Sequence, residues 1–334
     1  MSTHATAVEF MHGAGGGPVH MSRSLLGSKT SSQASMASPA DLVRYFRRED
    51  EDNTVGRRQT AVITGAARGL GLAFADTLAS AKCNIAALDI LPEPSPALLQ
   101  LESEHGVRVR YYKVDITSPE QIQGAIQQIE SDFPSIDINV NAAGVVTDEP
   151  FLTTTKSNID RTFAVNFTGS FLVAQACANS MVRRLTKANN ATDASSSSLQ
   201  IDPSTSGGSI VFIASIATHI ASTAQRISAY TASKGAVRSL VKPLAMELAP
   251  YGIRVNSLSP GYTMTDMMKG LQSQQPDLVK QFEQETLFGR IAVPDEVKGA
   301  LLFLCARGAS GWVTGQDLLV DGGASSWKHP AVLS

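Results

Sequence analysis

From Thr60 onward, the chain alternates short apolar runs with longer segments of helical periodicity. Each run is almost continuous in hydrophobic residues, which is typical of strands in a parallel sheet covered by helices on both faces. The runs span residues 60–64, 84–89, 108–115, 136–141, 209–214, 253–259 and 317–321. Seven such strands with helices between them predict a single doubly wound α/β domain with a mainly parallel sheet.

Two segments depart from this alternation. Residues 1–55 are expected to be a disordered or weakly ordered extension, because residues 1–40 are rich in Gly, Ser, Thr and Ala and lack periodicity. Residues 41–52 have the spacing of a short helix. The α/β domain then covers residues 56–334. Residues 187–208 are polar and Ser-rich, and we interpret them as a surface loop insertion outside the core.

Composition narrows the possible partners. The 334 residues carry a net charge of −2, so the chain has no basic field to bind nucleic acid or an anionic membrane. No apolar run in the sequence approaches the roughly 20 residues that a membrane span needs. Cys83, Cys177 and Cys305 lie in apolar surroundings without metal-ligand spacing. We therefore expect buried thiols in a reducing compartment and no metal site.

The composition of residues 1–40 bears on location. The segment has few acidic residues, which is a feature of transit peptides, but its strong bases are limited to Arg23 and Lys29. Transit peptides are rich in arginine. We therefore expect a cytoplasmic protein, with organelle targeting as the alternative.

A glycine-rich turn follows the first predicted strand. It contains Gly65, Gly69 and Gly71, with Arg68 and Leu70 between them, and it leads into a helical segment. Such a turn lets the backbone approach a pyrophosphate, which the N–H groups and the dipole at a helix N-terminus stabilise. This arrangement predicts a Rossmann-type dinucleotide site. The alternative interpretation is a tight turn needed for close helix packing.

The end of the second strand bears on the choice of cofactor. Asp89 lies 18 residues after Gly71, where an acidic residue accepts hydrogen bonds from the adenosine ribose hydroxyls. A 2′-phosphate beside this carboxylate would be repelled by about 4 kcal/mol at ~4 Å and an effective dielectric of about 20. NAD is therefore favoured over NADP. Arg68 keeps NADP open as the alternative, because a guanidinium can pair with a 2′-phosphate.

The next two strand ends add candidate cofactor contacts. Asp115 and Ile116 follow the third strand, where a carboxylate and an apolar side chain can hold an adenine edge. Asn141 and Gly144 bound the end of the fourth strand, where small residues let a cofactor lie over the sheet edge. Taken singly, each of these residues is also compatible with ordinary turn chemistry.

The second half of the chain carries candidate chemistry. Tyr230 and Lys234 lie four residues apart in a helical segment, so they share one face of the helix. A phenol has a pKa near 10, and we expect the nearby ammonium to lower the pKa of Tyr230 toward the working range of a general base. The alternative is an amphipathic helix with an interfacial tyrosine and a surface lysine.

Two polar residues upstream fit the same site. Ser215 follows the fifth strand, at the edge where a substrate oxygen can meet its hydroxyl. Asn166 lies within a long apolar helical segment and needs a hydrogen-bond partner or a water. The alternatives are a strand-end turn residue for Ser215 and a satisfied packing amide for Asn166.

Taken in order, these motifs resemble the short-chain dehydrogenase/reductase family over about residues 58–324. The motifs are TGAARGLG (64–71), Asp89, Asp115, NAAG (141–144), Asn166, Ser215, YTASK (230–234) and SPGYTMT (259–265). The resemblance implies a catalytic tetrad of Asn166, Ser215, Tyr230 and Lys234. It also implies that Lys234 binds the nicotinamide ribose, that Asn166 holds a water relaying protons, and that the protein is a homodimer or homotetramer.

The resemblance further implies roles for the segment after the sixth strand. Pro260, Gly261, Thr263 and Thr265 would contact the nicotinamide carboxamide, and residues 266–290 would form a substrate lid. Two departures from the family pattern stand out. Ala142 replaces the second asparagine of the usual NNAG motif, and Ser215 precedes Tyr230 by 15 residues, two more than in the commonest members.

The segments 215–230 and 290–304 are similar to fungal-type polyol dehydrogenases and ketose reductases. This similarity predicts an NAD(H)-dependent enzyme that interconverts a secondary alcohol and a ketone, a polyol and a ketose, with Tyr230 as general acid/base. His219 and Gln225 are interpreted as solvent-exposed loop residues, with contact to a polyhydroxylated substrate as the alternative. Two other functions stay open: an NADP-linked ketoreductase of a secondary-metabolite pathway, and a non-catalytic dinucleotide-binding sensor or scaffold.

Overall fold

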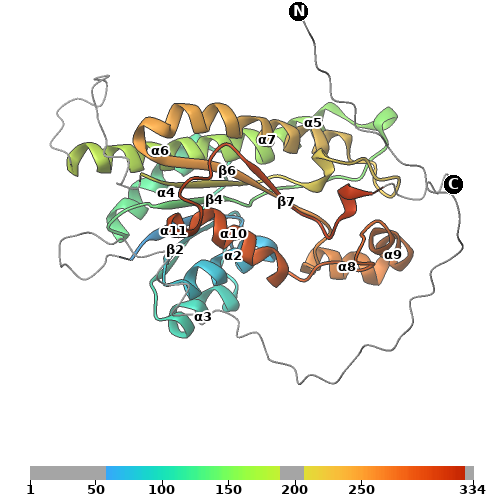
Figure 1. The fold of residues 1–334 in the computed structure, drawn as a ribbon, viewed down its shortest axis with the longest axis horizontal. Coiled ribbons are helices and arrows are strands. Elements are labelled where there is room, and N and C mark those ends of the chain that lie inside the picture. The colour runs from blue at the N-terminus through green and yellow to red at the C-terminus, as the bar shows by residue number, and fades with distance from the viewer. Residues whose placement is uncertain (1–57, 189–206, 328–334) are drawn as a thin grey trace, which may run out of the picture. The chain divides into compact units, whose positions relative to one another are not determined.

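The computed structural model describes residues 58–188 and 207–327, which belong to one compact unit. Its centre is a seven-stranded sheet in the order β3-β2-β1-β4-β5-β6-β7 (Figure 1). The strands are β1 (Thr60–Thr64), β2 (Asn84–Asp89), β3 (Val109–Lys113), β4 (Ile138–Asn141), β5 (Gly208–Ile213), β6 (Ile253–Pro260) and β7 (Asp317–Val320). Every pair of neighbouring strands is parallel, so the predicted doubly wound fold is confirmed.

Helices cover both faces of this sheet (Figure 1). Helices α2, α3 and α10 pack through Phe74, Leu98 and Leu301 on one face, and α4, α6 and α7 pack on the other. The helices are α2 (Gly69–Ser80), α3 (Pro96–His105), α4 (Pro119–Asp132), α5 (Lys156–Phe163), α6 (Ser170–Ala188), α7 (Ser228–Leu248), α8 (Asp266–Gln274), α9 (Pro276–Gln284), α10 (Asp295–Cys305) and α11 (Arg307–Ser310). Both faces of the sheet are therefore buried, as the continuous apolar runs predict.

Local signals in the sequence determine several helix ends. Helix α4 begins after Ser118, whose hydroxyl accepts a hydrogen bond from the backbone N–H of Gln121, and Pro119 occupies the first helical position. Helix α3 begins in the same way and ends at Gly106, which has a left-handed φ of 63°. A serine cap, a proline at the first position and a terminal glycine are the expected start and stop signals of helices.

Some predicted boundaries change in the structure. Helix α6 continues to Ala188 and β5 begins at Gly208, so both ends of the predicted 187–208 insertion belong to regular elements. Residues 189–206 of that insertion lie outside the described residues, as do the predicted extension 1–55 and its short helix. Strands β3 and β4 are shorter than predicted. The long helix expected around Asn166 is divided into α5, a π-helical segment (Ala164–Gly169) and α6.

Candidate active site

The candidate site is a cleft of about 1500 Å³ at the carboxyl ends of the strands. It includes the ends of β1 and β4, where the strand order reverses and doubly wound proteins bind ligands. This volume exceeds that of a typical drug-sized site, so it has room for a dinucleotide and a small substrate together. The predicted site residues that line it are Gly65, Arg68, Gly69, Leu70, Gly71, Asp89, Asp115, Ile116, Gly144, Ser215, Tyr230, Lys234, Pro260, Gly261, Thr263 and Thr265.

The glycine-rich turn has both a packing role and an open helix end. A Cβ at Gly71 would overlap the carbonyl oxygen of Gly65, and a Cβ at Gly65 would approach the backbone of Ala143 to 2.9 Å. Close packing therefore requires these two glycines. At Gly69, the first residue of α2, a Cβ would meet nothing closer than 4.0 Å, and Arg68 makes no side-chain cap. The first N–H groups of α2 therefore remain available to an anion such as a pyrophosphate.

Asp89 is held at the adjacent strand end. Its side chain is buried, with 7% of the residue exposed, and it lines the cleft. Its carboxylate accepts hydrogen bonds from the backbone N–H groups of Ala67 (3.0 Å) and Leu91 (3.2 Å). Because a carboxylate has about four lone-pair sites, Asp89 can still accept hydrogen bonds from ribose hydroxyls. Arg68 is exposed beside it.

The two candidate adenine contacts also reach the cleft. The Asp115 carboxylate accepts hydrogen bonds from the backbone N–H and the hydroxyl of Thr117, at 2.9 and 2.7 Å. Ile116 is buried against Gly169, where an added Cβ would approach the Ile116 side chain to 2.8 Å. This part of the cleft therefore combines one acceptor group with an apolar wall.

Asn141 is not part of the cleft lining. It is buried in β4, where its amide donates to Oδ1 of Asn139 at 2.7 Å. Its own Oδ1 is buried and accepts no hydrogen bond from the described residues. The end of β4 contributes Ala142, Ala143 and Gly144 to the cleft instead, so small residues lie at this edge as expected.

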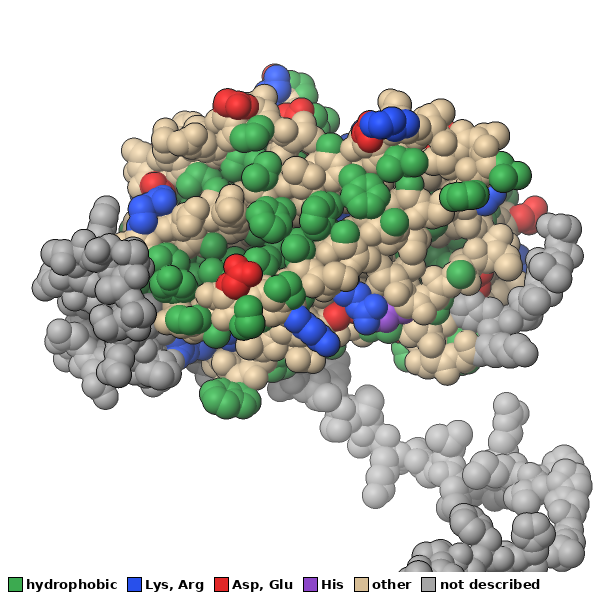
Figure 2. Space-filling view, turned by 90° about the horizontal axis from the view of Figure 1, so that it is seen from above, with side chains coloured by type: hydrophobic (Ala, Val, Ile, Leu, Met, Phe, Trp, Pro, Cys, Tyr) green, Lys and Arg blue, Asp and Glu red, His purple; other side chains and the backbone are tan. Residues whose placement is uncertain are grey.

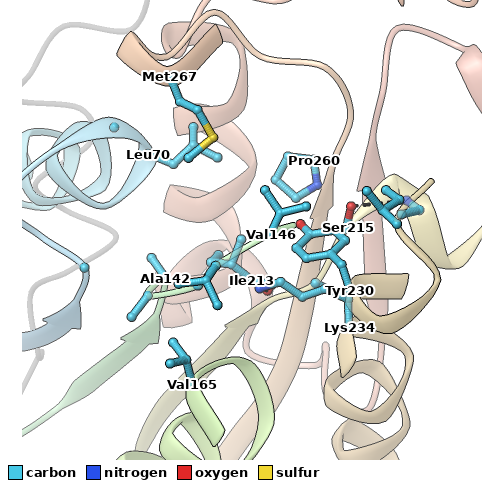
Figure 3. Close-up of a pocket in the computed structure, with 18 of the residues that line it drawn as sticks. Leu70, Ala142, Val146, Val165, Ile213, Ser215, Tyr230, Lys234, Pro260 and Met267 are labelled. Carbon is cyan, nitrogen blue, oxygen red and sulfur yellow. Dashed lines mark hydrogen bonds between the residues drawn. The ribbon is translucent and has the colours of Figure 1, made fainter. Parts of the chain in front are cut away.

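The side chains of Ser215, Tyr230 and Lys234 lie together at the carboxyl ends of β5 and β6, beside Pro260 (Figure 3). Tyr230 and Ser215 are joined by a side-chain hydrogen bond. The ammonium of Lys234 lies 5.9 Å from the centre of the Tyr230 ring and donates to the carbonyl oxygen of Ile213 at 2.7 Å. The structure thus brings three of the four predicted catalytic residues to one end of the cleft.

The electrostatics of this group differ from the expectation. Burial raises the pKa of Tyr230 above its usual value of 10, and the hydrogen bond with Ser215 offsets this only in part. The prediction that Lys234 lowers the pKa of Tyr230 below its usual value was therefore wrong. Burial also lowers the pKa of Lys234 to about 8. Both shifts favour the uncharged form, because the surrounding protein replaces water around Lys234, which is buried, and around Tyr230, which is half-buried.

Asn166 is completely buried next to this group but does not line the cleft. Its amide oxygen accepts from the backbone N–H of Val145 at 2.8 Å, and its amide nitrogen donates to the Val145 carbonyl and to the Ser233 hydroxyl, both at 2.9 Å. The side chain therefore fastens the segment after β4 to helix α7, one residue before Lys234. A proton-relaying water at Asn166 stays a prediction.

The loop between Ser215 and Tyr230 is less exposed than predicted. The ring of His219 is half-buried and lies 2.7 Å from the Asp317 carboxylate, so its interpretation as a solvent-exposed residue was wrong. Gln225 is also half-buried and lines the cleft. The loop is therefore folded onto the body of the protein and is not a free surface segment.

One cluster in the cleft wall was missed by the sequence analysis. Glu285, directly after α9, is buried and accepts hydrogen bonds from the hydroxyls of Tyr262 (2.5 Å) and Ser222 (2.7 Å). Both Tyr262 and Ser222 line the cleft. Neither composition nor spacing distinguishes Glu285 from the exposed acids around it, so no sequence signal could have found it.

Residues 58–188 and 207–327 also bear on a metal site, on the cysteines and on a membrane span. No group of His, Cys, Asp and Glu side chains there is arranged to hold a metal ion. Cys83, Cys177 and Cys305 are free and buried, as predicted, and burial raises the pKa of each thiol. Within the same ranges, no helix is long and apolar enough to cross a membrane.

Comparison with known proteins decides the family. A family model described as enoyl-(acyl carrier protein) reductase matches residues 65–325, most of the chain. This protein belongs to the short-chain dehydrogenase/reductase family. It is therefore an enzyme, an NAD(P)-linked oxidoreductase that acts on an alcohol or ketone group, and the interpretation as a non-catalytic sensor or scaffold is withdrawn.

Several relatives act on polyols according to their names. The chain is 33% identical over 278 residues to an NAD-dependent glycerol dehydrogenase of Listeria innocua, covering 83% of this chain and 98% of the relative. It is 33% identical over 267 residues to a D-threitol dehydrogenase of Mycolicibacterium smegmatis, covering 79% and 92%. It is 32% identical over 272 residues to a sorbose reductase of Candida albicans, covering 79% and 86%.

Solved structures agree with the fold. A gluconate 5-dehydrogenase of Burkholderia cenocepacia, solved with NADP and tartrate, has a TM-score of 0.71 to this chain. The two are 31% identical, and the match covers 86% of this chain and 99% of the other. Members similar to this chain thus include proteins named for NAD and proteins solved with NADP, so family membership leaves the choice of cofactor open.

Proposed function

We propose that this enzyme interconverts a polyol and the corresponding ketose with NAD(H), and that Tyr230 transfers the proton. The observation that carries the proposal is the grouping of Ser215, Tyr230 and Lys234 at one end of a cleft whose other end has an open helix N-terminus and the Asp89 carboxylate. Because these residues line one cleft, they support a proton-transfer group and a dinucleotide site that share one continuous space.

The three side chains have separate tasks in this proposal. The Ser215 hydroxyl holds the substrate oxygen, because a hydroxyl can donate to a ketone and accept from an alcohol. Tyr230 gives its hydroxyl proton to that oxygen during reduction and takes a proton from it during oxidation. The Lys234 ammonium lies 5.9 Å from the centre of the Tyr230 ring and favours the phenolate, although burial outweighs it in the pKa of Tyr230. The nicotinamide cofactor, when bound, donates or accepts the hydride at the carbon.

The raised pKa of Tyr230 favours ketone reduction, in which Tyr230 donates a proton. A phenol that stays protonated at neutral pH is ready to donate its proton to a ketone oxygen. In the oxidation direction the proton must first leave Tyr230, and a positive charge nearby lowers the free energy of the phenolate. Lys234, 5.9 Å from the centre of the Tyr230 ring, can supply this charge.

The proposed preference for NAD rests on Asp89. Its carboxylate is buried and held by two backbone N–H groups, so it cannot turn away from a 2′-phosphate. A specific observation favours the second candidate, NADP: Arg68 is exposed at the same end of the cleft, and the gluconate 5-dehydrogenase relative was solved with NADP. The affinities for NADH and NADPH separate the two candidates.

The proposed substrate class rests on two supports. Glycerol, D-threitol and sorbose name the substrates of relatives about one-third identical to this chain. The cleft lining also includes the polar side chains of Ser222 and Gln225, and the apolar Val146 lies beside Tyr230 (Figure 3), so a hydroxyl-bearing carbon chain would find both kinds of contact. An NADP-linked reductase of a secondary metabolite remains the second candidate, because the same cleft is large enough for a bulkier ketone.

A substrate panel tests the proposal. Purified protein is assayed with glycerol, D-threitol, galactitol and sorbitol plus NAD or NADP, and with L-sorbose plus NADH or NADPH, by following the absorbance of the reduced cofactor. We expect turnover of at least one polyol with NAD. Turnover of bulky aromatic ketones with NADPH, and of no polyol with either cofactor, would contradict the proposal and support the second candidate.

We also propose that the enzyme forms a homodimer or homotetramer. Helices α6 and α7 carry the half-buried apolar residues Phe171, Leu172, Leu240 and Leu244, and Met246 is exposed. Figure 2 shows hydrophobic side chains gathered on the face above these helices. Such a face is typical of helix pairing between subunits. Light scattering on the eluting protein measures the mass, and a monomer would contradict this part.

We also propose that the protein is located in the cytoplasm. The three buried cysteines are free, as expected for a protein kept in a reducing compartment. Imaging of the full chain fused at its C-terminus to a fluorescent protein tests this. A signal confined to an organelle would favour the targeting alternative.

A further inference from the structure

The buried carboxylate of Glu285 connects three parts of the cleft wall. Glu285 follows helix α9 and is 4% exposed. It accepts hydrogen bonds from Ser222, in the loop between Ser215 and Tyr230, and from Tyr262, in the segment after β6. The two hydroxyls therefore satisfy the hydrogen-bonding capacity of a carboxyl group that is buried in the wall.

Neighbouring residues of the loop make parallel contacts with the same helix. Thr223 accepts a hydrogen bond from the side-chain amide of Gln281 at 3.0 Å. Gln281 and Glu285 are four residues apart, so they follow one line along α9 and its end. Ala224 packs against the apolar cluster formed by Tyr262, Val279, Phe282 and Ile291. Three consecutive loop residues, 222–224, are therefore each attached to the lid.

The two helices of the lid are held differently. Helix α9 buries Val279 and Phe282, and the ring of Phe282 stacks on that of Tyr262 at 4.3 Å. Helix α8 buries none of its residues, and its Met267 is 71% exposed. The lid predicted for residues 266–290 thus has a more exposed rim, α8, whose Met268 and Leu271 pack against the same cluster, and a more deeply buried wall, α9.

We propose that Glu285 is a positioning residue that fastens the loop between Ser215 and Tyr230 to helix α9 and thereby shapes the wall that the substrate contacts. This inference rests on the proposed function for the identity of the substrate, but not for the attachment itself. Because residues 222–224 are attached to α9, this part of the wall is preformed.

The attachment predicts a specific kinetic effect. In Glu285→Gln, the amide keeps one acceptor but faces the second hydroxyl with a donor, so the link to Ser222 or Tyr262 weakens. We expect KM for the polyol to rise about tenfold, the effect of losing roughly one charge-assisted hydrogen bond, with kcat within about threefold of wild type. The Kd of NADH should change less than KM, because Glu285 bonds Tyr262 and Ser222 and none of the predicted cofactor contacts directly.

Ser222 variants make the test independent of folding defects at Glu285. Ser222→Ala removes one hydroxyl from a half-buried loop position and should raise KM in the same direction. Ser222→Thr keeps the hydroxyl and should restore KM. In the double variant Ser222→Ala/Glu285→Gln, the two increases in KM should not add, because both substitutions break the same contact. Glu283→Gln is the matched control, since it removes a carboxylate from the same helix at a position without a side-chain hydrogen bond in the described residues.

Hydrogen–deuterium exchange of the full-length protein separates this inference from the proposed function. We expect peptides covering residues 216–227 to exchange faster in Glu285→Gln and Ser222→Ala than in wild type and Glu283→Gln. Glycerol, D-threitol and galactitol with NAD are the kinetic probes. Faster exchange without turnover of any probe, even by wild type, would leave the attachment supported and the proposed substrate class wrong. Unchanged exchange, or a KM for polyol equal to wild type in both variants, would overturn the inference.

Discussion

Replacing Asp89 by asparagine should change the choice between NADH and NADPH. The carboxylate lies at the cleft edge, 7% exposed, and is oriented by the N–H groups of Ala67 and Leu91. Its repulsion of a 2′-phosphate is about 4 kcal/mol per charge pair at ~4 Å, or about 2 kcal/mol at ~8 Å, with an effective dielectric of about 20. The smaller value corresponds to a factor of about 30 in affinity.

Wild-type protein should therefore bind NADH at least about 30-fold more tightly than NADPH, and Asp89→Asn should remove most of that ratio. Titration of cofactor fluorescence measures both Kd values. The wild-type ratio should also shrink as salt is added, because the repulsion is screened. Glu93→Gln, which removes an exposed carboxylate shortly after the same strand, should leave the ratio within about twofold.

In Asp89→Asn, the amide NH₂ replaces one carboxylate oxygen and can no longer accept a hydrogen bond from Ala67 or Leu91. One buried N–H group then loses its partner, so we expect the free energy of unfolding to fall by about 1–3 kcal/mol. The melting temperature must be measured beside the affinities to show that the variant is folded at the assay temperature. Tighter binding of NADPH than of NADH by wild type would refute the reasoning. So would a ratio in folded Asp89→Asn that matches wild type within about threefold.

Three further predictions concern the chemistry and the fold. Tyr230→Phe should lower turnover by about 10²–10⁴-fold and leave the Kd of NADH unchanged; a variant that keeps more than about a tenth of the wild-type rate would exclude Tyr230 as the acid/base. Because burial raises the pKa of Tyr230, alcohol oxidation should accelerate from about pH 7 to about pH 9 while ketone reduction does not, and initial rates in both directions check this. Phe282→Ala should lower the free energy of unfolding by about 3–5 kcal/mol, measured by denaturant titration, because the ring is completely buried and stacked on Tyr262.

The sequence predicted the layers of the fold because burial on both faces leaves a clear pattern. Strands β1 and β2 match their apolar runs residue for residue, since every position in β1 and all but the first in β2 is buried. Strand β3 lies at the sheet edge, where its burial alternates and its ends are not held by two neighbours. Its predicted range was therefore too long.

The candidate site was predicted mostly by the order of motifs along the chain. In a doubly wound fold, every strand ends at the same edge, so residues that follow strands are brought together whatever their distance in sequence. That rule placed Asp89, Asp115 and Ser215 at the cleft. It failed for Asn141, because the last residue of β4 still points into the sheet.

Tertiary packing decided two features that the spacing of hydrophobic residues does not predict, the π-helical segment and the direction of the Tyr230 pKa shift. Whether the helix at Asn166 contains a π-helical segment depends on contacts with Val145 and Ser233, which come from distant parts of the chain. The direction of the Tyr230 pKa depends on how completely water is excluded, not on the four-residue spacing to Lys234. The sequence by itself determined the sheet, the glycine turn and the family of the chemistry. Only the tertiary structure decided which side chains are buried together, and hence the attachment of Glu285 to the loop before Tyr230, because a buried hydrogen bond joins residues that no local pattern connects.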